Sequence, residues 1–166
     1  FFQTGTYDKN REFVLTTSPS MDILISSNLE RLIYLICGED SEKTKELMEE
    51  LKTTGKYTIT LEMKEKLADF AAGYSTEEET AESIHDTYQK TGYVMDTHTA
   101  VAAHVCGQYR AKSGDQTKCV IASTASPYKF VKSVMSAIDA ENANADEFDL
   151  LPKLQEVSGV PMPQAI

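Results

Sequence analysis

The segment that decides the fold is Gly92–Phe130, GYVMDTHTAVAAHVCGQYRAKSGDQTKCVIASTASPYKF. Its pattern predicts a strand, a helix, a second strand, a turn and the start of another helix. The first strand is the short apolar run Val94-Met95. Asp96 or Thr97 can cap the helix that follows, because the side-chain oxygen of either residue can accept a free backbone N–H of the first turn.

The predicted helix runs from this cap to about Lys112. Ser113-Gly114 ends it, because glycine readily adopts the left-handed conformation that is common just after a helix. Several side chains of the helix are small, which would let it lie close to a sheet: Ala100, Ala102, Ala103 and Gly107.

The second predicted strand is Cys119–Ala122, an unbroken apolar run typical of a parallel strand that is buried on both faces. It leads into Ser123–Pro127, in which Ser126 can cap a helix and Pro127 suits the first helical position. Open α/β sheets bind ligands at the carboxyl ends of their strands. The segment therefore predicts an α/β fold, a partial parallel sheet with flanking helices, and a ligand site among these hydroxyl groups.

Composition limits the classes of partner. The chain has 166 residues and a formal net charge of −10, which opposes binding to nucleic acid or to an anionic membrane surface. No apolar run approaches the ~20 residues that span a bilayer. Cys37, Cys106 and Cys119 lie in apolar settings without CxxC spacing. We expect buried thiols in a reducing, cytoplasmic compartment, with no disulfide and no zinc site.

The N-terminal part alternates between apolar and hydroxyl-rich stretches. Phe13–Leu15 is a strand candidate, and Thr16–Ser20 is a break whose hydroxyl groups suit turns and caps. Ser26, Ser27 and Asn28 then precede a helix that Gly38 closes. The apolar stripe of this helix consists of Leu29, Leu32, Ile33 and Ile36.

The range 39–91 is charged, strongly helical and free of proline. Its alternating stretch Tyr57–Leu61 could be a short strand or the approach to a helix. Ser75 and Glu78 have the spacing of a capping box. We expect three helices: one from Asp40 or Ser41 to Gly55, one through Met63, Leu67 and Phe70 to Gly73, and one over Thr76–Lys90.

The C-terminal part is predicted to contain one more sheet-packing helix and an arm. The helix carries Phe130, Val134, Met135 and Ile138. A polar linker follows, and the arm, residues 141–166, contains a short amphipathic segment that Pro152 interrupts.

Three segments carry a family resemblance: TSPSMDILISSNLERL, MDTHTAVAAHV and VIASTASPYKF. In this order they resemble threonine synthase, a pyridoxal-phosphate enzyme of the tryptophan-synthase-β fold family. The resemblance implies the three-layer fold type II, here incomplete. It also implies the conversion of O-phosphohomoserine and water to threonine and phosphate. On this basis residues 1–38 belong to a large cofactor domain, 39–91 form a charged helical insertion, and 92–140 close the cofactor domain.

The sequence departs from the family pattern in one respect. Such enzymes carry the cofactor-binding lysine and a glycine-rich phosphate-binding loop in an N-terminal part, and neither motif occurs here. We therefore expect the C-terminal piece of a larger enzyme, inactive alone, without bound pyridoxal phosphate, and able to self-associate. The alternatives are another pyridoxal-phosphate lyase of the same fold type, or a non-catalytic folding or association module.

The resemblance also assigns candidate site residues. It implies that the Thr124 hydroxyl hydrogen-bonds the pyridine nitrogen of the cofactor. Asp96, His98 and Thr99 are candidates for lining the cofactor pocket, and helix capping alone would equally explain them.

For the substrate, Arg31 and Asn28 are the candidates. A solvated or salt-bridged Arg31 is the simpler interpretation. Lys129 does not match the cofactor-binding lysine of the family, and we expect no catalytic residue in this chain. His98 and His104 do not share a helix face, so no metal site is expected.

Overall fold

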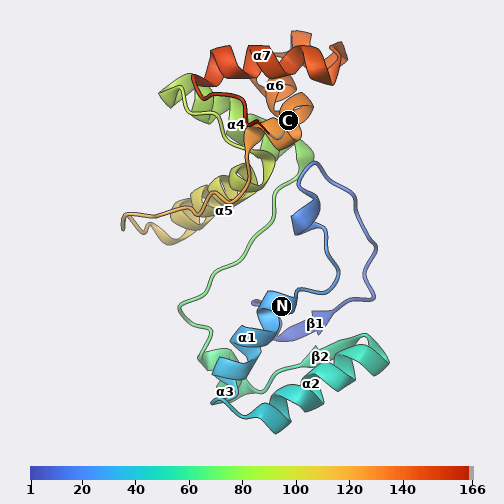
Figure 1. Cartoon of the computed structure of the whole chain (residues 1–166). Helices are drawn as coiled ribbons and strands as arrows, with labels where there is room; N and C mark the ends of the chain where they lie inside the picture. Colours follow the sequence, from blue (N-terminus) through green and yellow to red (C-terminus); the bar gives the residue numbers. More distant parts are fainter. Residues whose placement is uncertain (165–166) are drawn as a thin grey trace. The chain divides into compact units, whose positions relative to one another are not determined.

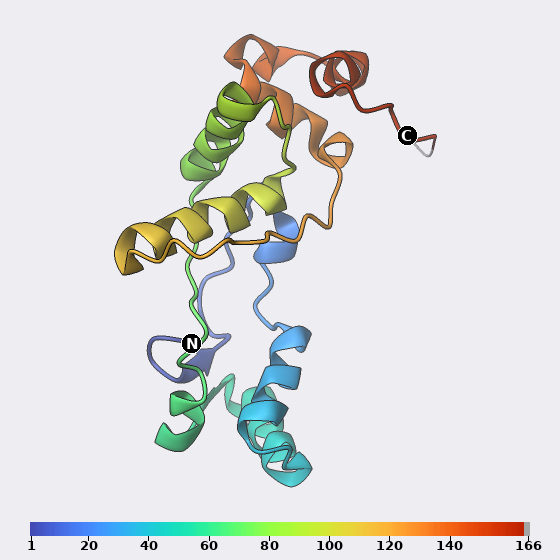
Figure 2. The same cartoon turned by 90° about the vertical axis from the view of Figure 1, so that its left-hand side faces the viewer.

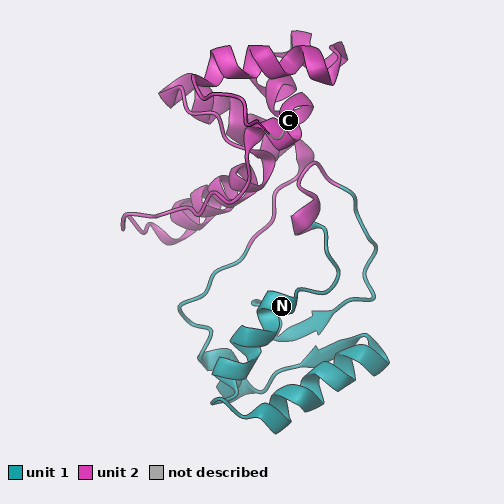
Figure 3. Ribbon diagram, viewed as in Figure 1, with its two compact units in different colours: residues 1–15, 22–72 teal, residues 16–21, 73–166 magenta. Residues whose placement is uncertain are grey.

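The computed structural model describes residues 1–164, and the chain forms two compact units (Figure 3). Unit 1 consists of Phe1–Leu15 and Asp22–Ala72. Unit 2 consists of Thr16–Met21 and the chain from Gly73 onward. A six-residue piece of the N-terminal region thus belongs to the C-terminal unit.

Unit 1 combines three helices with a two-stranded antiparallel sheet (Figure 1). Strands β1 (Thr6–Asp8) and β2 (Lys56–Thr58) pair so that Tyr7 lies opposite Tyr57, and the two rings stack with centroids 5.5 Å apart. Burial raises the pKa of the Tyr57 phenol well above its usual range. The helices are α1 (Ser27–Ile36), α2 (Ser41–Thr54) and α3 (Leu61–Glu65).

The core of unit 1 lies between these helices and the sheet. Asp40 caps α2, and Gly55 ends it in the left-handed conformation. The positive φ favours glycine at this position, and a Cβ there would also displace the end of the Asn10 side chain. The buried apolar residues are Ile33, Ile36, Leu47, Leu51, Tyr57, Ile59, Met63 and Leu67.

The regular secondary structure of unit 2 is entirely helical in the residues described, and irregular segments such as residues 114–126 connect the helices. Its longer helices are α4 (Glu77–Thr91), α5 (Thr97–Ser113), α6 (Val131–Ile138) and α7 (Glu147–Ser158). Short 3-10 helices are η1 (Pro19–Met21), η2 (Pro127–Phe130) and η3 (Ala140–Asn144). Helix α4 packs on α5 and α6, and α7 packs on α6. The central side chains of this core include Ile84, Val94, Ala100, Val134, Leu150 and Leu154.

Most helix boundaries follow the predicted signals, but the helix expected through Leu67 and Phe70 to Gly73 is shorter, since α3 ends at Glu65. Asp96 caps α5 and Gly114 ends it in the left-handed conformation, as predicted. The capping box of α4 is Thr76 with Glu79, one residue later than the predicted pair. Pro152 lies inside α7 and does not interrupt it.

The predicted parallel sheet is not found in residues 1–164. Val94 and Met95 are buried but form no strand, and Phe13–Leu15 is exposed and unpaired. Cys119–Ala122 runs beside α5 without a strand partner (Figure 2), and Val120 is 88% exposed. A central strand must exchange hydrogen bonds with neighbours on both sides. Residues 1–164 contain one strand pair, β1 with β2, and it is antiparallel.

The compact units do not follow the predicted boundaries at residues 38 and 91. Helices α2 and α3 pack in unit 1, whereas α4 packs in unit 2, so the division falls between Ala72 and Gly73. The assignment of these ranges to a cofactor domain, an insertion and an arm remains a prediction.

Candidate functional site at the start of α5

Asp96 is the centre of a buried polar cluster in unit 2. The residue is 1% exposed. Oδ1 accepts the backbone N–H groups of His98 and Thr99 at 2.9 and 3.3 Å, and Oδ2 accepts a short hydrogen bond from the Thr99 hydroxyl. Because both carboxylate oxygens accept donors from α5 itself, the geometry agrees with the capping alternative for Asp96.

His98 joins α5 to the Thr16–Met21 segment. Its Nε2 accepts the backbone N–H of Ser20 at 3.2 Å, which requires Nε2 to be unprotonated. Its Nδ1 then carries the proton and lies 3.4 Å from both Thr97 Oγ1 and Asp96 Oδ1. The ring packs against Phe130, with centroids 4.9 Å apart. Both ring nitrogens are therefore engaged in neutral His98.

A second contact fixes the same segment. The Thr97 hydroxyl donates to the backbone oxygen of Thr17 at 2.8 Å. The Glu77 carboxylate at the start of α4 accepts the Thr17 backbone N–H at 3.0 Å and the Thr17 hydroxyl at 3.3 Å. The structure thus brings the TSPS and MDTHTA motifs together, although they lie about 80 positions apart in the sequence.

Thr99 links this cluster to the hydroxyl-rich turn. Its Oγ1 lies 3.0 Å from Ser123 Oγ in a hydrogen bond, next to Thr124. Thr124 is exposed, and its hydroxyl has no hydrogen-bond partner within residues 1–164. Ser126 caps η2 as predicted, through the N–H of Tyr128. Thr124 is therefore not needed to satisfy the local backbone.

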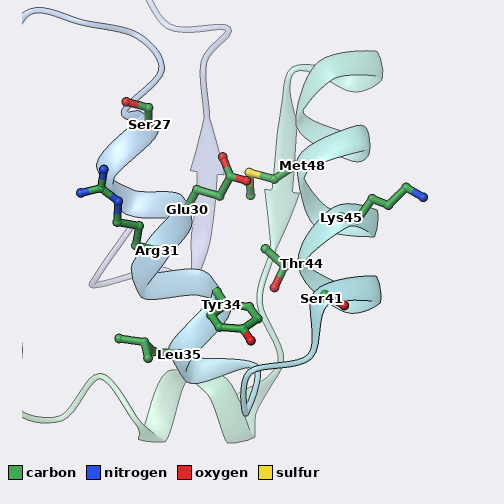
Figure 4. Close-up of a pocket in the computed structure, with 9 residues that line it drawn as sticks. All are labelled: Ser27, Glu30, Arg31, Tyr34, Leu35, Ser41, Thr44, Lys45 and Met48. Carbon is green, nitrogen blue, oxygen red and sulfur yellow. The ribbon is translucent and has the colours of Figure 1, made fainter.

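The two substrate candidates lie in the other compact unit. Asn28 and Arg31 are exposed residues of α1. Arg31 lines an open groove of about 770 Å³ between α1 and α2, together with Tyr34, Lys45 and Met48 (Figure 4). The charged ends of Arg31 and Lys45 point in opposite directions, so they do not converge on one anion. The role of Asn28 and Arg31 remains a prediction.

Sequence reasoning missed the partners that complete the cluster. These partners are Thr17, Ser20 and Ser123, which bond to residues at the start of α4 or α5, and Glu77, which is the first residue of α4 and bonds to Thr17. A hydroxyl-rich turn gives no local signal of which distant helix it will contact. Within the described part of the chain, no group of three or more His, Cys, Asp or Glu side chains could hold a metal ion. No helix there is long and apolar enough to cross a bilayer.

We expect His98→Phe to loosen the Thr16–Met21 segment. Phenylalanine keeps a ring against Phe130 but removes the acceptor of the Ser20 N–H, at a cost of about 1–2 kcal/mol in the free energy of unfolding. Hydrogen exchange at the Ser20 amide should accelerate. The matched control is His85→Phe, because His85 makes only an exposed contact to a backbone oxygen. Unchanged protection of Ser20 would contradict the role of His98.

Comparisons with known proteins relate this chain to one family. Residues 99–164 match the family model described as threonine synthase, C-terminal. Threonine synthase-like 1 from Pongo abelii is 36% identical over 163 residues, covering 97% of this chain and 22% of that protein.

Two solved structures are similar in both sequence and fold. Threonine synthase from yeast gives a TM-score of 0.78 at 32% identity, covering 97% of this chain and 35% of that one. Threonine synthase from Brucella melitensis, solved with pyridoxal phosphate bound, gives 0.73 at 39% identity, covering 82% of this chain and 29% of that one. The chain thus spans between about a fifth and about a third of the length of these relatives.

The structural neighbours define a class of pyridoxal-phosphate-dependent enzymes, the threonine synthases. The relatives cover almost the whole chain, and the family model covers the α5 helix, the hydroxyl-rich turn and the C-terminal helices. The chain belongs to the threonine synthase family.

Proposed function

We propose that this chain forms the C-terminal part of a threonine synthase that converts O-phosphohomoserine and water to threonine and phosphate. The observation that carries the proposal is the free Thr124 hydroxyl beside the anchored Ser123, within the range that matches the threonine synthase C-terminal model. The cytoplasm is the proposed compartment.

The hydroxyl groups of the turn suit pyridoxal phosphate. This cofactor, when bound, serves as an electron sink for carbanion chemistry. Thr124 would donate its hydroxyl hydrogen to the pyridine nitrogen. A neutral hydroxyl would not stabilise a protonated ring, as an aspartate would.

The cluster at the start of α5 would hold Thr124 in place. The Thr99 hydroxyl bonds both Asp96 and Ser123, so the residue before Thr124 is tied to the cap of α5. His98 and Thr97 tie the TSPS segment to the same helix end. In this proposal Thr124 contacts the cofactor, whereas Asp96, His98 and Thr99 position the pocket wall.

The full activity would also require parts that this chain does not contain. Lys129, five residues after Thr124, is an exposed residue of η2 and lies outside the family's lysine motif. We propose that the chain alone neither binds pyridoxal phosphate stably nor turns over substrate. Self-association of the isolated chain is a further proposal, supported by the exposure of Val120 and Leu15 and testable by light scattering.

The activity test compares the full-length protein from the source organism with the 166-residue chain. With pyridoxal phosphate and O-phosphohomoserine, we expect the full-length protein to release threonine and phosphate in equal amounts. The chain alone should release neither. Phosphate release without threonine, or turnover by the chain alone, would overturn the assignment.

A second candidate is a related lyase that acts on another phosphorylated or hydroxylated amino acid. It is favoured by the match to threonine synthase-like 1, which is 36% identical to this chain, whereas yeast threonine synthase is 32% identical. Turnover of such a substrate, with none of O-phosphohomoserine, would select this candidate.

A further inference from the structure

Two of the three cysteines form a close pair that the sequence did not indicate. Cys106 lies in the middle of α5, and Cys119 lies in the segment that returns beside this helix. Their sulfur atoms are 3.1 Å apart, and both residues belong to unit 2. The expectation of buried thiols was wrong for this pair, since Cys119 is exposed and Cys106 only partly buried.

We propose that Cys106 and Cys119 are a redox modification site, which forms an intramolecular disulfide on reaction with a peroxide. The sulfur atoms would move from 3.1 Å to a bond of about 2.05 Å. Disulfides that form in reducing compartments are usually transient and redox-sensing.

The turn between the two cysteines is tied down, so their proximity follows from the fold. Gly114 ends α5 in the left-handed conformation and donates its N–H to the oxygen of Arg110. The Arg110 guanidinium donates to the Thr117 oxygen at 2.6 Å. Asp115 accepts from the Thr117 N–H at 2.8 Å and from the Tyr109 hydroxyl at 3.1 Å. These bonds direct the chain back along α5 towards Cys106.

The exposure and the hydrogen bonding of the two thiols differ, so each has a different role in the proposed reaction. Cys119 is exposed and can meet a peroxide from solvent. Cys106 donates its S–H to the Cys119 sulfur, and this hydrogen bond raises the pKa of Cys106. Cys119 is therefore the attacking sulfur and Cys106 the resolving one.

The reaction balances in two steps. The Cys119 thiolate attacks one peroxide oxygen, the O–O bond breaks, and the departing oxygen takes up a proton to leave as an alcohol or water. Cys106 then attacks the sulfenic acid sulfur, the S–O bond breaks, and water leaves with the Cys106 proton. Two thiols lose two electrons in total, and one peroxide gains them.

A metal ion between the two thiols is not supported. No third His, Cys, Asp or Glu side chain within residues 1–164 completes a metal-binding group around them. Cys37, the remaining cysteine, belongs to unit 1 and contacts the Met63 sulfur at 3.9 Å.

The test treats the whole chain with hydrogen peroxide and counts thiols. Of three titratable thiols, we expect one to remain, and dithiothreitol should restore all three. Trypsin cuts between the two cysteines at Arg110, Lys112 and Lys118, so a disulfide appears as two joined peptides that separate on reduction.

Cys37→Ser is the matched control and should lose both remaining thiols to the same joined peptides. Cys106→Ser and Cys119→Ser should each form no internal disulfide. Survival of all three thiols, a disulfide between two chains, or sulfinic acid on Cys119 beside an intact Cys106 would each overturn the proposal. These readouts need neither cofactor nor substrate, so their failure leaves the proposed function standing.

Discussion

Asp96→Ala should lower the free energy of unfolding of unit 2 by about 2–4 kcal/mol, because it combines the loss of a helix cap with buried donors left unpaired. The carboxylate accepts two backbone N–H groups and one hydroxyl, and Asp96 is 1% exposed. Water cannot readily replace it at a position so deeply buried. Chemical denaturation followed by circular dichroism measures the loss.

Two further variants distinguish the effect of losing a helix cap from the effect of leaving buried donors unpaired. Asp146 caps α7 through the Phe148 N–H, but it is exposed, so Asp146→Ala should cost only about 1 kcal/mol. Asp96→Asn keeps a carbonyl oxygen for the cap and should fall between the two alanine variants. Equal losses for Asp96→Ala and Asp146→Ala would show that the buried cluster adds nothing beyond ordinary capping.

Thr124→Val in the full-length protein should reduce turnover by about 10- to 100-fold. This expectation rests on the proposed function. Valine keeps the β-branched shape but deletes the hydroxyl, which would leave the acceptor on the cofactor unpaired at a cost of about 1–3 kcal/mol. Steady-state release of threonine measures the effect.

The stability of Thr124→Val distinguishes ligand binding from a local structural role. Thr124 is exposed and makes no hydrogen bond within the described residues, so the melting temperature should not change. Thr124→Ser restores the donor and should recover most of the rate. A Thr124→Val enzyme with full turnover would remove Thr124 from the cofactor site.

Helix boundaries could be predicted from the sequence because their signals are local. The Asp40 cap, the left-handed glycines at 55, 92 and 114, and the Ser126 cap each act on backbone groups within a few residues. The strands could not be predicted in the same way. An apolar run such as Cys119–Ala122 becomes a strand only when partners supply its hydrogen bonds, and this depends on the rest of the fold.

The candidate site was predictable only in part, for the same reason. The sequence indicates Asp96 or Thr97 as the cap of α5, and in the structure Asp96 is the cap and Thr97 the first helical residue. The contacts that complete the cluster join Thr17 and Ser20 to a helix about 80 residues away. The local sequence of neither segment indicates that the two will be in contact. The family resemblance identifies both motifs, but it does not say which residues of one bond to the other.

The place of Thr16–Met21 in unit 2 has a consequence for the order in which the chain folds. All core residues of unit 1 have been synthesised by Leu67, so its core can form before α5 exists. Thr17 and Ser20 must wait for Thr97 and His98. Their contacts close a loop of roughly 80 residues, which includes most of the sequence of unit 1, at a modest entropic cost. A piece beginning at Gly73 would keep most of the unit 2 core but would leave the Thr97 hydroxyl and His98 Nε2 without their native partners. Domain exchange between relatives should therefore carry Thr16–Met21 together with α5, although the two lie far apart in the gene.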